Sequence, residues 1–199
     1  MTALAPDQED QINDDQVVLL DPTGRPCGTA PRLEVHGLDT PLHLAFSCHV
    51  RNPEGQVLIT RRSLDKATWP GVWSNSFCGH PRPAEPVRTA VTRHAEHELG
   101  LQLREVELSL PLFRYRAVDA SGTVENEICP VFVAETTDEV KPRPDEVMEY
   151  AWVDPIDLGR SIRLTPSVFS PWLVLQAQLL PLLGGVAPVA AASQRELAG

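Results

Sequence analysis

The chain has 199 residues, and its 27 acidic against 17 basic side chains give a formal net charge of -10. A surplus of negative charge repels polyanions, so we expect no nucleic-acid partner. Apolar residues make up 42% and charged residues 22%, which is typical of a globular protein and excludes a fibrous repeat or wholesale disorder.

The N-terminal segment MTALAPDQEDQINDD is acidic and lacks the basic and apolar regions of a secretory signal. We therefore expect a cytoplasmic protein whose four widely spaced cysteines stay reduced. Residues 1–15 and 186–199 are predicted to be tails, the second rich in Ala and Gly. A single domain is predicted between them, over residues 16–185.

Short apolar runs with high β-propensity predict strands along the body of the chain. They lie at residues 17–20, 44–50, 57–60, 76–78, 113–117, 129–134 and 150–153. Turn sequences at 21–24, 52–55 and 119–122 each end in glycine and suit hairpins. These hairpins predict a mixed, largely antiparallel sheet.

Two segments predict helices that cover this sheet. Apolar residues recur at helical spacing over 86–99, and Gly100 follows as a stop. A second helix is predicted at 171–183 with Ser170 as its cap, and short helical turns at 145–148 and 155–158. Polar residues and Pro181 interrupt the second helix, so we expect no stable membrane insertion. The fold class is α/β (α+β), an α/β/α sandwich.

The segment 79–101 follows the spacing of the Nudix motif: glycine, five residues, glutamate, seven residues, arginine, then an acidic helix end and glycine. The matching positions are Gly79, Glu85, Arg93, Glu98 and Gly100. In such a loop and helix, carboxylates face a divalent cation that bridges diphosphate oxygens. His94 and His97 stand where Nudix hydrolases carry glutamates, which predicts a conserved fold without the carboxylates that hydrolysis needs.

Residues from about 17 to 176 resemble type I isopentenyl diphosphate isomerases. The segments that carry the resemblance are 42–50, 60–81, 113–132, 145–153 and 169–174. The resemblance implies conversion of isopentenyl diphosphate to dimethylallyl diphosphate, through protonation and deprotonation and a tertiary carbocation, for isoprenoid biosynthesis. We expect this small-molecule substrate to be the main partner, and the chain to be a monomer or weak homodimer.

The residues themselves also predict a metal site. Cys78 and His80 alternate on one extended segment and Glu125 and Glu127 on another, so each pair shares a face. Imidazoles and carboxylates together suit Mn²⁺, Zn²⁺ or Mg²⁺-like ions. The resemblance implies that one Mn²⁺ or Zn²⁺ ion is held by His36, His43, His80, Glu125 and Glu127. It further implies that Glu98 shares a Mg²⁺ ion with the substrate diphosphate.

The resemblance assigns the two acid/base roles to Cys78 and Glu127, on opposite faces of the carbon–carbon double bond. Taken alone, a cysteine in such a strand is usually a small core residue. Trp172 is expected to stabilise the carbocation through its indole face, and the less favoured alternative is a core tryptophan at a helix start. The resemblance places the Tyr115 hydroxyl beside Glu127, as a hydrogen-bonding assistant.

Basic side chains are expected to bind the diphosphate. Arg62 and Lys66 match positions of the resembled family, while Arg32 stands where a lysine is common. His94 stands where a second arginine often follows Arg93, which puts its contribution to phosphate binding in doubt. Two other hypotheses remain open, a Nudix hydrolase of a nucleoside diphosphate derivative and a catalytically silent metal-binding module.

Overall fold

A computed structural model describes residues 16–186 of the chain. The predicted tails, 1–15 and 186–199, lie outside the described residues except for Val186. The prediction of a single domain over 16–185 stays a prediction. No helix within the described range is long and apolar enough to cross a membrane.

The described strands form two sheets. In spatial order, the first consists of β2 (Pro26–Pro31), β1 (Gln16–Leu20), β3 (His43–Leu44), β10 (Val124–Ile128) and β9 (Arg114–Val118). The second consists of β12 (Val147–Val153), β5 (Val57–Arg62), β4 (Phe46–Arg51), β11 (Val131–Glu135) and β8 (Arg104–Leu110), with β6 (Trp73–Ser74) beside β5 and β7 (Phe77–Gly79) beside β4. Only β3 with β10 and β4 with β11 pair in parallel among these strands. The prediction of a mixed, largely antiparallel sheet is therefore confirmed.

The predicted single sheet is divided where two strand segments change partners. Ala45 separates β3 from β4, and Cys129 and Pro130 separate β10 from β11. Pro130 has no backbone N–H, so it cannot donate to a continuous ladder. Its carbonyl still accepts from Ser47 N at 3.1 Å, which keeps the two sheets close at this junction.

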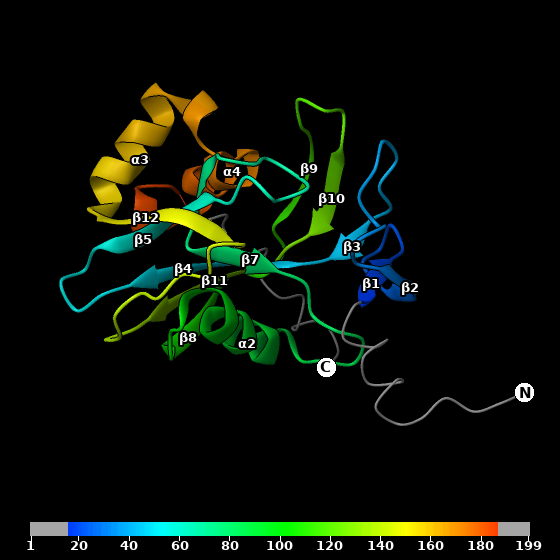
Figure 1. Cartoon of the computed structure of the whole chain (residues 1–199), viewed down its shortest axis with the longest axis horizontal. Helices are drawn as coiled ribbons and strands as arrows, with labels where there is room; N and C mark the ends of the chain where they lie inside the picture. Colours follow the sequence, from blue (N-terminus) through cyan, green and yellow to red (C-terminus); the bar gives the residue numbers. More distant parts are fainter. Residues whose placement is uncertain (1–15, 187–199) are drawn as a thin grey trace, which may run out of the picture.

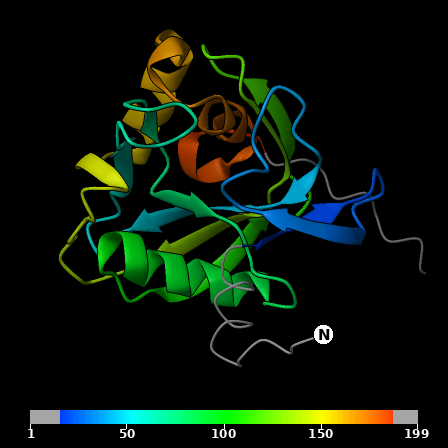
Figure 2. The same cartoon turned by 45° about the vertical axis from the view of Figure 1, so that its right-hand side comes forward.

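Helices cover both faces of the second sheet, as Figures 1 and 2 show. Helix α2 (Val87–Leu99) lies on one face, and α3 (Pro155–Leu164) with α4 (Pro171–Leu179) lies on the other. Strand β5 serves both layers, because Leu58 joins the core under α2 while Val57 and Ile59 join the core under α4. The α/β/α sandwich is therefore confirmed.

The helix predicted at 86–99 is confirmed, and it ends where Gly100 takes a left-handed conformation with φ of 65°. The prediction for 171–183 is wrong in its last four residues, because α4 ends at Leu179. Pro181 disfavours a helical residue before it, and Leu180 is extended at φ -83° and ψ 117°. A separate 3-10 turn, η2 (Pro181–Leu183), follows. Ser170 occupies the N-cap position as expected, but its hydroxyl makes no capping hydrogen bond and lies 3.0 Å from the hydroxyl of Ser74.

The two short predicted turns have opposite outcomes. Residues 155–158 form the first turn of α3, where the side chain of Asp154 accepts the N–H groups of Ile156 and Asp157. The helical turn predicted at 145–148 is wrong, since Val147 already begins β12. The short 3-10 helix η1 (Pro166–Val168) links α3 to α4.

Four strands escaped prediction because their sequences lack an apolar run. Strand β2 is mostly exposed and forms only by pairing with β1, and the two-residue β6 is too short to show a pattern. Strands β8 and β10 mix charged with apolar residues.

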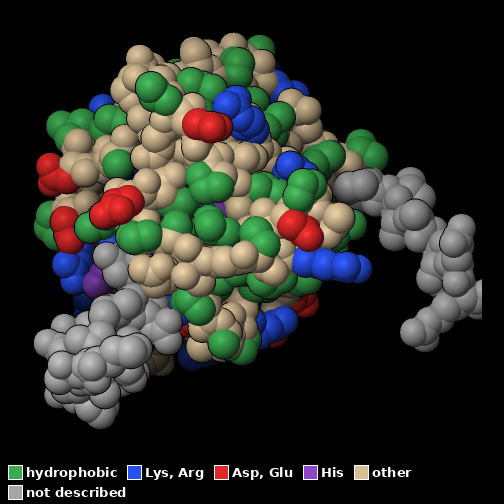
Figure 3. Space-filling view, turned by 90° about the vertical axis from the view of Figure 1, so that its right-hand side faces the viewer, with side chains coloured by type: hydrophobic (Ala, Val, Ile, Leu, Met, Phe, Trp, Pro, Cys, Tyr) green, Lys and Arg blue, Asp and Glu red, His purple; other side chains and the backbone are tan. Residues whose placement is uncertain are grey.

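On the face of the molecule that carries the β1–β2 hairpin, basic and acidic side chains are interspersed among apolar ones (Figure 3).

Candidate active site

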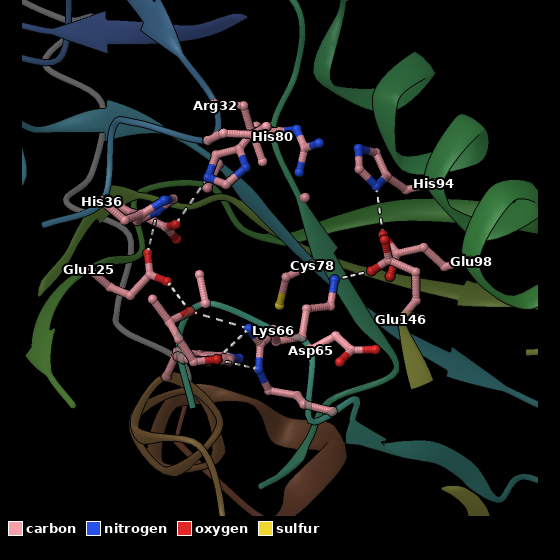
Figure 4. A pocket seen from close by; sticks show the side chains of 18 of the residues that line it. Arg32, His36, Asp65, Lys66, Cys78, His80, His94, Glu98, Glu125 and Glu146 are labelled. Carbon is pink, nitrogen blue, oxygen red and sulfur yellow. Dashed lines mark hydrogen bonds and ion pairs between the residues drawn. The ribbon is translucent and has the colours of Figure 1, made fainter. Parts of the chain in front are cut away.

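A pocket of about 300 Å³ gathers side chains from both sheets, from α2 and from the start of α4. Figure 4 shows His36 and Glu125 on one side of the pocket, Cys78 and Lys66 near its middle, and His94, Glu98 and Glu146 on the other side. Almost all predicted site residues line it: Arg32, His36, Arg62, Lys66, Cys78, His80, Glu98, Tyr115, Glu125, Glu127 and Trp172. His43 lies directly behind, in contact with His80 and Glu127.

Four of the predicted metal ligands form one cluster. A ligand atom from each of His36, His43, His80 and Glu127 lies within 4.8 Å of the others. The Nε2 atoms of His43 and His80 lie 3.4 and 3.3 Å from Glu127 Oε1. Glu125 adjoins the cluster, with its Oε2 atom 3.0 Å from Nε2 of His36.

The donor atoms of this cluster fit a divalent ion. The Nε2 atoms of the three histidines and Oε2 of Glu125 are buried and have no hydrogen-bond partner among residues 16–186. Buried polar atoms are otherwise almost always paired, because leaving them unpaired costs free energy. These atoms lie close together without forming hydrogen bonds, as expected for ligand atoms that point at a common metal ion. The nitrogen and oxygen set suits Mn²⁺ or Zn²⁺.

The local structure explains why these atoms converge. His43 and Glu127 face each other in register across the parallel strands β3 and β10. Nδ1 of His43 donates to the carbonyl of Pro41 at 2.9 Å, which leaves Nε2 as the free ligand atom. Thr68, which the sequence did not single out, donates its hydroxyl to Glu125 Oε1 at 2.7 Å and fixes that carboxylate.

Burial and mutual charge set the protonation of the cluster. Burial raises the pKa of Glu127, but the adjacent imidazoles of His43 and His80 outweigh it and hold this pKa well below its usual range. Burial lowers the pKa of His80 to about 4. Burial and the charge of Glu127 raise the pKa of Glu125. A neutral His80 and an ionised Glu127 are the forms that bind metal.

Cys78, the middle residue of β7, lines the same pocket. Its Sγ atom lies 3.2 Å from Ser47 Oγ and donates to Asn75 Oδ1 at 3.2 Å. Burial raises the pKa of Cys78 to about 11, and the hydrogen bonds with Ser47 and Asn75 oppose this shift only in part. The side chain is therefore a thiol at neutral pH.

Two aromatic side chains close the pocket between thiol and carboxylate. The Trp172 indole N–H donates to Asn75 Oδ1 and to Ser74 Oγ, both at 2.9 Å. The ring centroid of Tyr115 lies 5.8 Å from that of Trp172, and Tyr115 is in register with Glu127 across β9 and β10. Burial, reinforced by Glu127 and Glu125, raises the Tyr115 pKa well above its usual value, so the phenol keeps its proton.

Two of the basic residues expected to bind the diphosphate, Arg62 and Lys66, already contact other side chains and backbone groups of the protein. The guanidinium of Arg62 donates to the carbonyls of Thr68 and Trp69 and lies 5.3 Å from the Trp172 ring centroid. Lys66 forms an ion pair with Glu146, an acidic residue that the sequence analysis did not single out. Arg62 therefore braces the wall of the pocket, and Lys66 is partly neutralised.

The Nudix-like segment forms the loop and helix between β7 and the end of α2. Arg93 donates to both carboxylate oxygens of Glu85 at 2.9 and 2.7 Å, which ties the helix to the loop before it. Glu98 is 7% exposed and faces the pocket, where His94 Nδ1 lies 2.7 Å from its Oε1 atom. His94 therefore holds the carboxylate predicted to bind Mg²⁺ (Figure 4).

Known proteins resemble this chain in both sequence and fold. Residues 41–173 match the family model described as the NUDIX domain. The chain is 64% identical over 169 residues to an isopentenyl-diphosphate Delta-isomerase from Agromyces mediolanus, covering 85% of this chain and 82% of that protein. A protein of the same name from Paenarthrobacter aurescens is 54% identical over 177 residues, covering 86% and 96%.

The chain belongs to the type I isopentenyl-diphosphate Delta-isomerases, within the NUDIX superfamily. The fold agrees, since a crystal structure of DR0079 from Deinococcus radiodurans aligns with a TM-score of 0.60, covering 81% of this chain and 96% of that one. Because the two sequences are only 19% identical, the similarity to DR0079 shows the fold alone.

Family membership explains the sequence segments that cluster here, but several side chains of the site had no local signal. Thr68, Asn75 and Glu146 are ordinary polar residues that bind Glu125, Trp172 and Lys66, all of which lie far from them in the sequence.

Proposed function

We propose that this chain converts isopentenyl diphosphate to dimethylallyl diphosphate by moving protons at the substrate's carbon–carbon double bond. One observation carries the proposal: a protonated thiol, Cys78, and an ionised carboxylate, Glu127, line the same pocket. An acid and a base of opposite protonation state are what proton addition and removal require. The shared name of close relatives supports the same reaction.

Cys78 and Glu127 would exchange protons with the substrate from opposite sides. Protonation of the alkene gives a tertiary carbocation, and removal of a proton from the neighbouring carbon completes the isomerisation. Trp172 would stabilise the cation through its indole face, an attraction of about 0.5–2 kcal/mol. The neutral phenol of Tyr115 would assist Glu127. The burial of Glu127, Trp172 and Tyr115 and the partial burial of Cys78 would keep water from trapping the cation.

The metal-binding roles follow from the donor atoms. We infer that His36, His43, His80, Glu125 and Glu127 hold one Mn²⁺ or Zn²⁺ ion, and that Glu98 holds Mg²⁺ together with the diphosphate. Bound ions would supply fixed positive charge that keeps Glu127 ionised and neutralises the diphosphate. Arg32, Arg62 and Lys66 would orient the diphosphate.

A Nudix hydrolase is less well supported than an isomerase. His94 and His97 replace the carboxylates that complete the hydrolase motif, and His97 is exposed. The remaining expectations, a monomer or weak homodimer in the cytoplasm without a nucleic-acid partner, belong to the same proposal.

The test is incubation of the purified chain with isopentenyl diphosphate, Mg²⁺ and Mn²⁺, with and without chelator, followed by NMR of the products. We expect metal-dependent dimethylallyl diphosphate. Release of phosphate without isomerisation would instead support the hydrolase, and no reaction would support a silent module.

Variants of the acid and the base sharpen this test. Cys78→Ala and Glu127→Gln should each lower kcat by at least about 100-fold, because positioned acid/base groups contribute that much. Cys27→Ser is the matched control, since Cys27 is exposed and away from the pocket. It should keep full activity. Near-normal turnover by either site variant would contradict the two-base mechanism.

A further inference from the structure

Three polar side chains cross the apolar core between the second sheet and α4. Ser47 and His49 project from β4, Gln176 projects from α4, and all three are fully buried. Burying polar groups costs free energy unless they are hydrogen-bonded to one another, and apolar residues could fill this layer at no such cost. The proposed mechanism does not yet use any of the three.

The hydrogen bonds between them run in one direction. His49 Nε2 lies 2.9 Å from Gln176 Oε1, and Gln176 Nε2 donates to Ser47 Oγ at 2.9 Å. An amide oxygen only accepts, so His49 carries its proton on Nε2. Nδ1 of His49 is accordingly a bare acceptor, and it has no partner in the described part of the chain.

Because Ser47 Oγ accepts from Gln176, its own proton is free for another acceptor. The two acceptors in reach are sulfur atoms, Cys78 Sγ at 3.2 Å and Cys129 Sγ at 3.4 Å. The shorter of these contacts leads to the thiol at the pocket. The reverse orientation of the amide would leave a buried N–H of His49 unpaired, which is more costly than a bare acceptor.

We propose that Gln176 and His49 are positioning residues that turn the hydroxyl of Ser47 toward the sulfur of Cys78, and that the reaction depends on this orientation. The inference rests on the proposed function, because Cys78 must exchange a proton with the substrate. Its sulfur carries negative charge whenever that proton is on the substrate. A hydroxyl donor stabilises charged sulfur more than neutral sulfur.

The decisive variant is Gln176→Glu, which keeps the size of the side chain but reverses one hydrogen bond. A carboxylate still accepts from His49, but it also attracts the Ser47 proton away from Cys78. We expect kcat to fall about tenfold with KM within about twofold of wild type. Gln176→Met removes both hydrogen bonds at similar volume and should lower kcat comparably.

Ser76→Ala is the matched control. The Ser76 hydroxyl is also fully buried, but it accepts from the N–H of Val50 and donates its proton to the carbonyl of Leu58 rather than to Cys78. This variant should unfold more easily and keep its kcat. Each protein is checked for folding by near-ultraviolet circular dichroism and for bound metal by elemental analysis, neither of which should change in Gln176→Glu.

The outcomes separate the inference from the function on which it rests. Folded Gln176→Glu and Gln176→Met proteins with wild-type kcat would overturn the inference while the wild-type chain still isomerises. A kcat loss in Ser76→Ala equal to that in Gln176→Glu would also overturn it, because the effect would then be structural. A wild-type chain without isomerase activity overturns the proposed function and the inference together.

Discussion

At the scale of single residues, burial decides most protonation states. Cys78 and Tyr115 keep their protons because burial raises their pKa values, whereas Glu127 ionises because two imidazoles lie against it. The ordinary pKa values of these side chains do not give the size or the direction of the individual shifts. It arises because each group meets a different set of neighbours in the same pocket.

His49 gives a pH-dependent prediction at this scale. Burial lowers its pKa to about 4 from an ordinary value of 6.5. Between these values the unfolded chain binds more protons, so stability is full above pH 6.5 and is lost as the pH falls toward 4. The difference corresponds to about 3 kcal/mol in the free energy of unfolding.

Urea unfolding of wild type and His49→Phe at pH 7 and pH 4.5 measures this contribution. The variant should be less stable at pH 7, because Gln176 loses a partner, but its stability should fall less between the two pH values. The lowered pKa of His80 contributes to the pH dependence of the unfolding free energy in both proteins, so some loss of stability at pH 4.5 remains in the variant. Parallel pH profiles would show that His49 is not the group responsible.

At the scale of elements, the close contact between β7 and α2 sets the geometry of the Nudix-like segment. A Cβ atom added to Gly79 would lie 2.6–2.7 Å from three atoms of the His94 ring. The ring also packs edge-on against Phe46, at 5.3 Å between centroids. Glycine at the end of β7 therefore makes room for the histidine that holds Glu98.

Gly79→Ala should displace His94 and lower the free energy of unfolding by about 1–3 kcal/mol. In a His94→Ala background the same change should cost much less, because the obstructing ring is gone. Urea unfolding of the four proteins gives the coupling energy, which we expect to be at least about 1 kcal/mol. Additive effects would mean that the added methyl group meets something other than His94.

At the scale of the whole molecule, the His and Glu cluster joins the two sheets. His43 and Glu127 belong to the first sheet, while His80 directly follows β7 of the second. An ion held by these residues would link the two sheets in addition to the strand junctions and the shared apolar core. Metal binding should therefore stabilise the entire fold.

Removal of metal by a chelator should lower the unfolding temperature in calorimetry. Ligand in 100-fold excess over its Kd stabilises by about 2.7 kcal/mol, and a tightly held ion should contribute at least this much. His43→Ala should abolish the difference between metal-loaded and chelated protein. His97→Ala should keep it, since His97 is exposed on α2. Equal unfolding temperatures with and without metal in wild type would refute the prediction.

The sequence by itself determined those features that local patterns encode. The periodicity up to Gly100 gave α2, the glycine turns gave the hairpins, and the motif spacing with the family-like segments gave the site residues around Cys78. Local backbone preferences and side-chain periodicity suffice for such features. The same reasoning missed strands such as β2, which is held by its partner and has little β-propensity of its own.

Only the tertiary structure decided which polar side chains meet across the fold. Ser47 and Gln176 are 129 positions apart, and Lys66 and Glu146 are 80 apart. Nothing in the residues near either partner marks such a pair, because hydrogen bonds and ion pairs depend on distances that the packing of sheets and helices sets. The sequence therefore indicated the chemistry of Cys78 and Glu127, whereas packing decided the protonation of both groups and the side chains that hold them.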